Sequence, residues 1–223
     1  MIRTSRWVLF VSIVLAATAM PRTSAQELGD VAEKLAQSLE ALRGYSWKSR
    51  VETSVDDRRT STHLYEVEVD TNGSLKRTLI ESDGKAVKAG QQAEQTLSSI
   101  RQLIDGYIHM SKDNLRKAFG DDARIYEADQ DGLGRVRARD VFASGDEINM
   151  WFDVTDLRVR RAEIETVMQQ QPCRLDAEFS PLEGGPNVVT RSVFNIAAVR
   201  KKGKPTGTRM TVVTENFEHR RAR

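Results

Sequence analysis

The sequence contains little of what builds a disulfide framework, a metal site or a catalytic centre. It has one cysteine, Cys173, so no internal disulfide can form. Its histidines are His63, His109 and His219, and none has a cysteine or a second histidine two or four positions away, as a zinc site would require. No nucleophile elbow, phosphate-binding loop or dinucleotide fingerprint occurs. We therefore predict no cofactor, no metal and no enzymatic activity, and we interpret Cys173 as a small core residue.

The sequence also lacks a hydrophobic run of the ~20 residues that a membrane-spanning helix needs. Its apolar stretch, Trp7–Ala17, follows Arg3 and Arg6 and precedes small residues, which is typical of a secretory signal peptide. Cleavage is predicted after Ala25, with Ala19 as a second choice, and retention of the leader as an anchor stays an alternative. No cysteine follows the leader, so a lipid-modified N-terminus is not expected.

Removing residues 1–25 changes the charge of the protein. The leader contains three arginines and no acid, so residues 26–223 carry 31 basic and 32 acidic side chains, a net charge of −1. Such a balance does not favour a nucleic-acid partner. We predict a signal peptide over 1–25, one domain over 26–223, and a monomer in the periplasm or secreted.

The basic residues are concentrated near the C-terminus. From Arg191 onward there are nine basic residues and two acidic ones, Glu215 and Glu218, a net charge of +7. One interpretation is a solvated edge strand protected by lysine and arginine. The alternative is attraction of this C-terminal hairpin to an anionic membrane surface.

Apolar and polar residues alternate through Val136–Met168 in three runs, separated by turn residues at 144–146 and 153–156. The apolar row of the middle run is Ile148, Met150, Phe152 and Val154. A period of two bounded by Gly, Asp and Ser indicates strands and turns. Connections this short join antiparallel neighbours, so we predict an antiparallel meander as the core.

Other segments show the same alternation. Further strands are predicted over Tyr45–Val55, Thr62–Asp70, Leu75–Ser82, Pro172–Ser180, Val188–Val199 and Thr206–Glu218. The alternation slips by one residue near Arg160 and Arg161, which indicates a β-bulge that would curve the sheet.

Two regions have helical periodicity instead. Glu27–Arg43 carries an apolar stripe and is followed by Gly44, a typical residue after a helix end. A second stripe lies between residues 86 and 120, and Ser111 is placed to begin another short helix there. A helical insertion between strands must pack its stripe on a face of the sheet.

This order of elements resembles the periplasmic lipoprotein carriers, the LolA/LolB-like family. The best local matches are Glu81–Lys85, which ends in Ser-Asp-Gly-Lys, and Met150–Asp153 followed by Leu157 and Arg158. The resemblance implies an α+β fold: a strongly curved antiparallel sheet, or incomplete β-barrel, with an N-terminal helix and a helical insertion closing its concave face.

The resemblance also implies a function. Family members hold a lipid or acyl chain in the apolar hollow, and an arginine from one strand fastens the helical lid. The matching strand here, Leu75–Ile80, contains Lys76 and Arg77 but lacks the family's proline, so the lid-fastening role is assigned to neither residue.

We predict a binding protein for a lipid, an acyl chain or a lipoprotein, taking part in outer-membrane biogenesis. The predicted contacts in the hollow and its lid are Trp47, Tyr65, Leu97, Ile100, Leu103, Ile104, Tyr107, Ile108, Met150 and Phe152. Enclosing an apolar ligand requires a concave apolar surface with few polar groups. The alternative is a periplasmic sensor or docking module that binds a protein partner through the same surface.

Overall fold

The computed structural model describes residues 24–70, 74–83, 91–110, 114–115, 118–120, 124–126, 132–197, 199–201, 204–206 and 209–221. The predicted leader lies outside these residues except for its last two positions. The short helix predicted from Ser111 also falls largely outside them. Among the described helices, none is long and apolar enough to cross a membrane.

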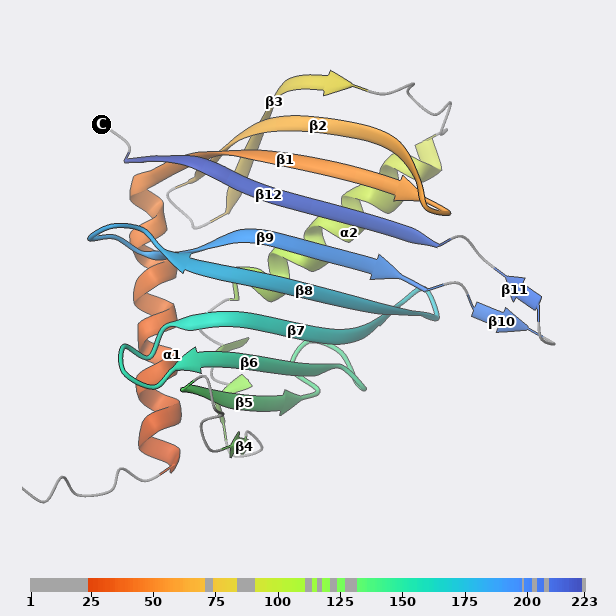
Figure 1. Cartoon of the computed structure of the whole chain (residues 1–223). Helices are drawn as coiled ribbons and strands as arrows, with labels where there is room; N and C mark the ends of the chain where they lie inside the picture. Colours follow the sequence, from red (N-terminus) through yellow and green to blue (C-terminus); the bar gives the residue numbers. More distant parts are fainter. Residues whose placement is uncertain are drawn as a thin grey trace, which may run out of the picture.

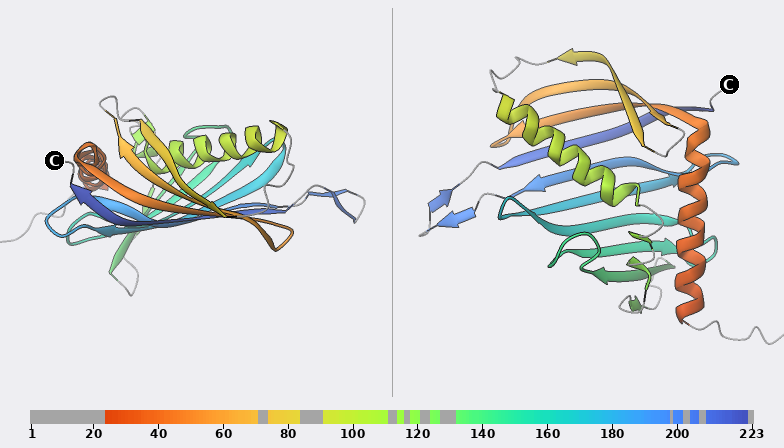
Figure 2. Two further views of the ribbon diagram at one scale, coloured as in Figure 1. Left: turned by 90° about the horizontal axis from the view of Figure 1, so that it is seen from above. Right: turned by 180° about the vertical axis from the view of Figure 1, so that it is seen from behind.

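Ten strands form one antiparallel sheet (Figure 1). They are β1 (Tyr45–Val55), β2 (Arg58–Val69), β3 (Leu75–Asp83), β4 (Arg124–Tyr126), β5 (Leu133–Arg139), β6 (Glu147–Asp153), β7 (Val159–Met168), β8 (Gln171–Pro181), β9 (Asn187–Ile196) and β12 (Met210–Arg221). Their order across the sheet is β3-β2-β1-β12-β9-β8-β7-β6-β5-β4. The sheet is curved and has two separate edges, β3 and β4, so the predicted incomplete barrel is confirmed (Figure 2).

The last predicted hairpin is interrupted in the structure. β9 ends at Ile196 and β12 begins at Met210, and between them β10 (Val199–Lys201) pairs with β11 (Lys204–Thr206) as a separate two-stranded ribbon. This ribbon projects beyond the ends of the main strands (Figure 1). Val199 and Thr206, the inner ends of the two predicted strands, do pair, but in a ribbon separate from the β9–β12 ladder.

Two helices lie on the concave face of the sheet (Figure 2). α1 (Ser24–Ala41) continues into a 3₁₀ turn, Leu42–Gly44, and crosses the ends of the strands. α2 (Gln91–Ile108) runs diagonally over the strands. The chain leaves one edge at β3 and next pairs at the opposite edge as β4, so the helix between them must cross the sheet.

The core lies between the concave face and these helices. Its most buried side chains include Val31 of α1, Ile100 of α2, and Ile148, Leu175 and Phe194 of the sheet, each with an exposed fraction of 0%. The alternation predicted from sequence matches the buried face of β5, β6, β7 and β8, whereas β3 has no buried residue.

The predicted bulge in β7 is confirmed. Trp151 of β6 lies opposite Arg161, whereas the next residue, Phe152, lies opposite Val159, so Arg160 has no opposite residue in β6. The Arg160 guanidinium instead binds the carboxylate of Asp153, at 3.0 Å. Because of this extra residue, Arg160 and Arg161 follow each other between two buried apolar residues of β7.

Val154 does not continue the apolar row of β6, as its sequence pattern predicted. The turn begins at Asp153, as predicted, and Asp153 accepts hydrogen bonds from the amides of Thr155 (2.9 Å) and Leu157 (2.8 Å). Val154 consequently points outward and has an exposed fraction of 49%.

Substituting Gly134→Ala should destabilise the sheet. A Cβ atom at this position of β5 would lie 2.5 Å from Cζ of Phe152, whose ring is buried on the facing strand. Overpacking of this kind costs about 1–3 kcal/mol, which urea denaturation would measure as a lower free energy of unfolding. Gly29→Ala in α1 is the matched control, because nothing lies within 4 Å of its Cβ position. If the two substitutions change the free energy of unfolding equally, the expected clash with the Phe152 ring is contradicted.

Candidate functional site

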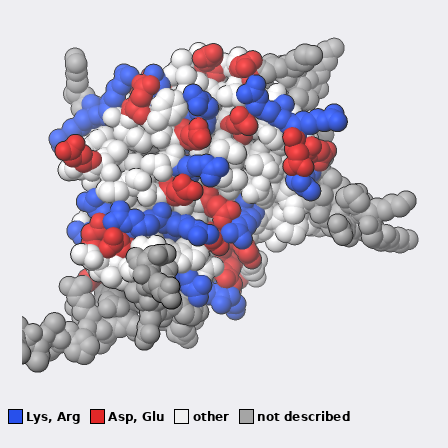
Figure 3. All heavy atoms as spheres, viewed as in Figure 1, with Lys and Arg blue, Asp and Glu red and all other residues white. Residues whose placement is uncertain are grey.

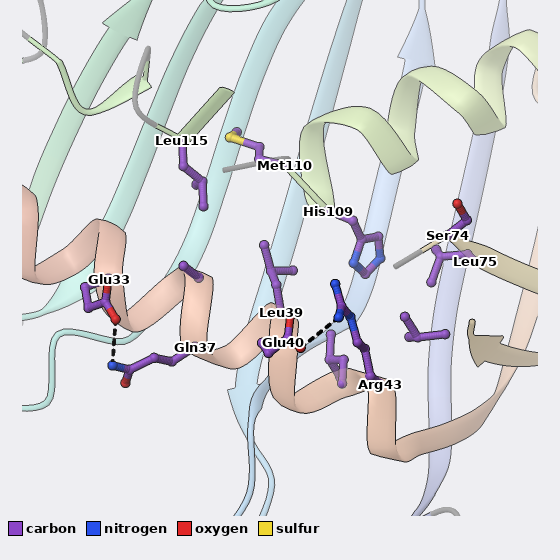
Figure 4. A pocket seen from close by; sticks show the side chains of 13 residues that line it. Glu33, Gln37, Leu39, Glu40, Arg43, Ser74, Leu75, His109, Met110 and Leu115 are labelled. Atoms are coloured by element: carbon purple, nitrogen blue, oxygen red, sulfur yellow. Dashed lines mark hydrogen bonds and ion pairs between the residues drawn. The ribbon is translucent and has the colours of Figure 1, made fainter. Parts of the chain in front are cut away.

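A hollow of about 640 Å³ lies between α1, the end of α2 and the β2–β3 hairpin (Figure 4). We call it the α1–α2 hollow. Its apolar wall consists of Ala36, Leu39, Leu42, Val69, Leu75, Met110 and Leu115. Ligand sites in proteins commonly measure about 300–1,000 Å³ and are mostly apolar, so this hollow has the size and lining of such a site.

Polar side chains from α1 line the same hollow. Gln37 donates to Glu33 at 3.0 Å, and Arg43 binds Glu40 at 2.8 Å (Figure 4). The two side chains of each pair bind each other, so the apolar wall of the hollow remains available to a ligand.

His109, at the end of α2, also lines the α1–α2 hollow (Figure 4). The pKa of His109 is lowered to about 4, chiefly by burial; the carboxylate of Asp105 opposes the shift and the positive charge of Arg77 adds to it. The imidazole is therefore neutral at physiological pH.

A second, much smaller space of about 40 Å³ lies beneath α2. Trp47, Ile104 and Ile108 line it, so the helix is packed closely onto the sheet. This space and the α1–α2 hollow share two lining residues, Leu75 and His109. The two spaces therefore meet at the end of α2.

Polar contacts attach α2 to the first strands. Arg77 of β3 donates two hydrogen bonds to the carboxylate of Asp105, at 2.8 and 2.6 Å. Both side chains are about one quarter exposed. Arg101 donates to the hydroxyl of Tyr65 at 2.8 Å, and its guanidinium also lies over the tyrosine ring. Arg77 and Tyr65 thus connect α2 to the strands at one edge of the sheet.

Tyr107 attaches the same helix to the other half of the sheet. Its hydroxyl donates to Asp146 at 2.8 Å and lies 3.1 Å from the hydroxyl oxygen of Thr166. Asp146 is 2% exposed and also accepts the amide hydrogens of residues 141–143. Burial raises the pKa of the Tyr107 hydroxyl well above its usual value, so it stays a donor.

The structure places most of the predicted contact residues in the core. Trp47, Tyr65, Ile100, Ile104, Tyr107, Ile108, Met150 and Phe152 are buried, and Leu97 and Leu103 are partly buried. None of these ten lines the α1–α2 hollow. Their role as ligand contacts stays a prediction that requires α2 to move.

The sequence pattern predicted packing of α1 on the sheet and did not predict the hollow beside it. Leu39 belongs to the predicted apolar stripe, and Ala36 lies beside it; both line the hollow and are partly buried. The signal in the sequence is Ala36, an apolar residue that widens the stripe. Cys173 is 4% exposed, in agreement with its predicted place in the core. Among the described residues, no group of three His, Cys, Asp or Glu side chains is placed to hold a metal ion.

The convex face carries basic and acidic side chains side by side (Figure 3). Several basic residues of the C-terminal segment have acidic partners: Arg191 with Glu178 at 3.7 Å, Arg209 with Asp57 at 2.8 Å and Arg220 with Glu218 at 3.0 Å. This pairing is typical of a solvated surface. The side chains of residues 199–208 lie outside the described part of the chain, and attraction of the hairpin to an anionic membrane stays a prediction.

Together these features define a half-barrel whose concave face is covered by a helix, with an apolar hollow beside that helix. No family model matches the sequence, and no curated protein matches it.

Among solved structures, the chain is similar to a LolA superfamily protein from Nitrosomonas europaea, with 11% identity, a TM-score of 0.40, and coverage of 86% of this chain and 93% of that one. A DUF1329 family protein from Desulfovibrio piger has 9% identity and a TM-score of 0.49, with 90% and 94% covered. The MucA/MucB complex of Pseudomonas aeruginosa has 12% identity and a TM-score of 0.24, with 87% and 99% covered. The LolA-like resemblance predicted from sequence is found again among these structures, and function is argued below from this chain's own contacts.

The stability of the protein should fall as the pH drops from about 6.5 towards 4, in part because of His109. The folded-state pKa of about 4 lies below the usual 6.5, so the unfolded state binds more protons between these values. His109→Gln should remove this part of the pH dependence. Urea denaturation of both proteins between pH 4 and 6.5 measures the free energy of unfolding at each pH. If this free energy changes with pH equally in the two proteins, His109 does not contribute to the pH dependence.

Proposed function

We propose that this chain is an exported, non-catalytic binding protein that holds the acyl chain of a lipid or of a lipoprotein anchor. Following the family resemblance, its task would be transport towards the outer membrane. The observation that carries the proposal is the α1–α2 hollow of about 640 Å³ with its apolar wall. Each methylene group buried there would contribute about 0.8 kcal/mol.

The position of α2 supports a closed resting state. The space beneath the helix is about 40 Å³, too small for an acyl chain, whereas the adjoining α1–α2 hollow has room for one. A chain that enters the hollow would pass Leu75 and His109 to reach the space beneath α2. Lifting the helix would then expose Trp47, Ile104 and Ile108 to the ligand.

Ala36→Trp should weaken acyl-chain binding about tenfold or more, because an indole ring would occupy the α1–α2 hollow. Fluorescence titration with dansyl-labelled undecanoic acid measures the affinity, and native mass spectrometry of protein purified without detergent detects a co-purifying lipid. Gln102→Trp is the matched control, since this exposed position on α2 lines neither space.

Equal loss of affinity in the two tryptophan variants would contradict this location of the site. A protein that carries no lipid and takes up none would contradict the acyl-chain function itself.

Asp105→Asn should raise the affinity for the same probe about fivefold at neutral pH. Removing the carboxylate breaks the paired hydrogen bonds from Arg77, and a larger open population increases apparent affinity. Asp83→Asn is the control, because its ion pair with Arg59 spans 4.0 Å and is largely exposed. Unchanged or lower affinity in Asp105→Asn would mean that the ion pair does not hold the lid closed.

A second candidate function is docking of a protein partner. Edge strand β3 exposes Leu79 and Ile80, with exposed fractions of 53% and 49%. An unpaired edge with apolar side chains can accept a strand from another protein. Absence of acyl-chain binding in the titration above would favour this candidate.

A further inference from the structure

A second hollow, of about 360 Å³, lies on a neighbouring face of α1, and Gln37 lines both hollows. It is formed where α1 meets the start of β1, the β6–β7 turn, the β8–β9 loop and the end of β12. Figure 1 shows these turns and the C-terminus gathered beside α1. Nothing in the proposed acyl-chain function uses this hollow.

Three cationic side chains from distant parts of the sequence line this second hollow: Lys34 of α1, Arg158 of the β6–β7 turn and Arg221 of β12. Among the described residues that line it, none carries a carboxylate. The other polar groups there belong to Gln37 and to the hydroxyl-bearing Ser38 and Tyr45. We call this site the cationic hollow.

Acids close in sequence to these cations bind other partners. Glu33, beside Lys34, accepts a hydrogen bond from Gln37 at 3.0 Å. Asp156 accepts a hydrogen bond from the Arg160 side chain at 2.8 Å, and Glu218 binds Lys48 at 2.7 Å and Arg220 at 3.0 Å. Within the described part of the chain, Lys34, Arg158 and Arg221 form no ion pair. Three like charges facing one hollow without a counter-charge create a strongly positive local potential.

The backbone around the cationic hollow is held in place. The amide of Arg158 donates to Asp156 at 2.9 Å, and its carbonyl accepts from Asp153 at 3.0 Å. Arg221 lies directly opposite Tyr45 in the β1–β12 ladder. At Gly185, a Cβ atom would lie 2.9 Å from the Tyr45 hydroxyl, so the β8–β9 loop approaches the tyrosine closely. The positions of the cations therefore follow from the fold.

We propose that the cationic hollow binds a phosphate-bearing anion. Guanidinium groups recognise phosphate oxygens through paired, charge-assisted hydrogen bonds, and lysine adds a point charge. The hydroxyls of Ser38 and Tyr45 can donate to the remaining oxygens. Free phosphates and lipid phosphate headgroups share this chemistry, so both are tested.

Isothermal titration calorimetry of the full mature chain at low ionic strength would use two probes separately: inorganic pyrophosphate and dihexanoyl phosphatidic acid. Arg158→Gln and Lys34→Gln should each weaken binding about tenfold, and added salt should weaken it further. Arg220→Gln is the matched control, because it removes the same charge beside Arg221 from a residue that is already paired with Glu218.

Binding of pyrophosphate with this pattern would assign a soluble phosphate, whereas binding of phosphatidic acid alone would assign a lipid headgroup. If neither probe binds, or if Arg158→Gln and Arg220→Gln bind alike, the proposal is overturned. Circular dichroism confirms that the variants fold. Ala36→Trp should leave this binding unchanged, since Ala36 does not line the cationic hollow, so the two sites fail or succeed independently.

Discussion

The arrangement of the molecule depends on the pairing of β12 with two strands far from it in the sequence. β12 forms antiparallel ladders with β1 on one side and β9 on the other. Without it, the hairpins β1–β3 and the meander β5–β9 would be two separate sheets with too little surface for one core. Its insertion makes β3 and β4 the edges, and the segment between them then has to cross the concave face.

That crossing explains where the hollows lie. α2 fills the concavity along its diagonal and is attached on both sides, by Arg77 to Asp105 and by Tyr107 to Asp146. The corner between its end and α1 is left without a side chain large enough to fill it. A partly exposed ion pair such as Arg77–Asp105 contributes modestly to stability, so the proposed lifting of α2 would cost less on this side. The buried hydrogen bonds of Asp146 are costlier to break and favour movement hinged at that side.

The charges of the protein are arranged differently on its two faces. On the convex face, acids and bases of neighbouring strands pair, as Arg191 does with Glu178. Beside α1, Lys34, Arg158 and Arg221 line one hollow without an acidic partner among the described residues. The near-zero net charge of residues 26–223 therefore conceals a local concentration of positive charge, because net charge is a sum over the whole surface.

The sequence by itself determined the local structure. Alternation predicted β1–β3, β5–β9 and β12 but not the short β4, the phase slip predicted the bulge at Arg160, and the helical stripes predicted α1 and α2. Each of these patterns is set by neighbours within a few residues. Only the tertiary structure decided which residues face a hollow. The Arg77–Asp105 pair joins residues 28 positions apart, and the cationic hollow unites positions 34, 158 and 221. Such contacts depend on the order and register of strands across the whole sheet, which no local period specifies.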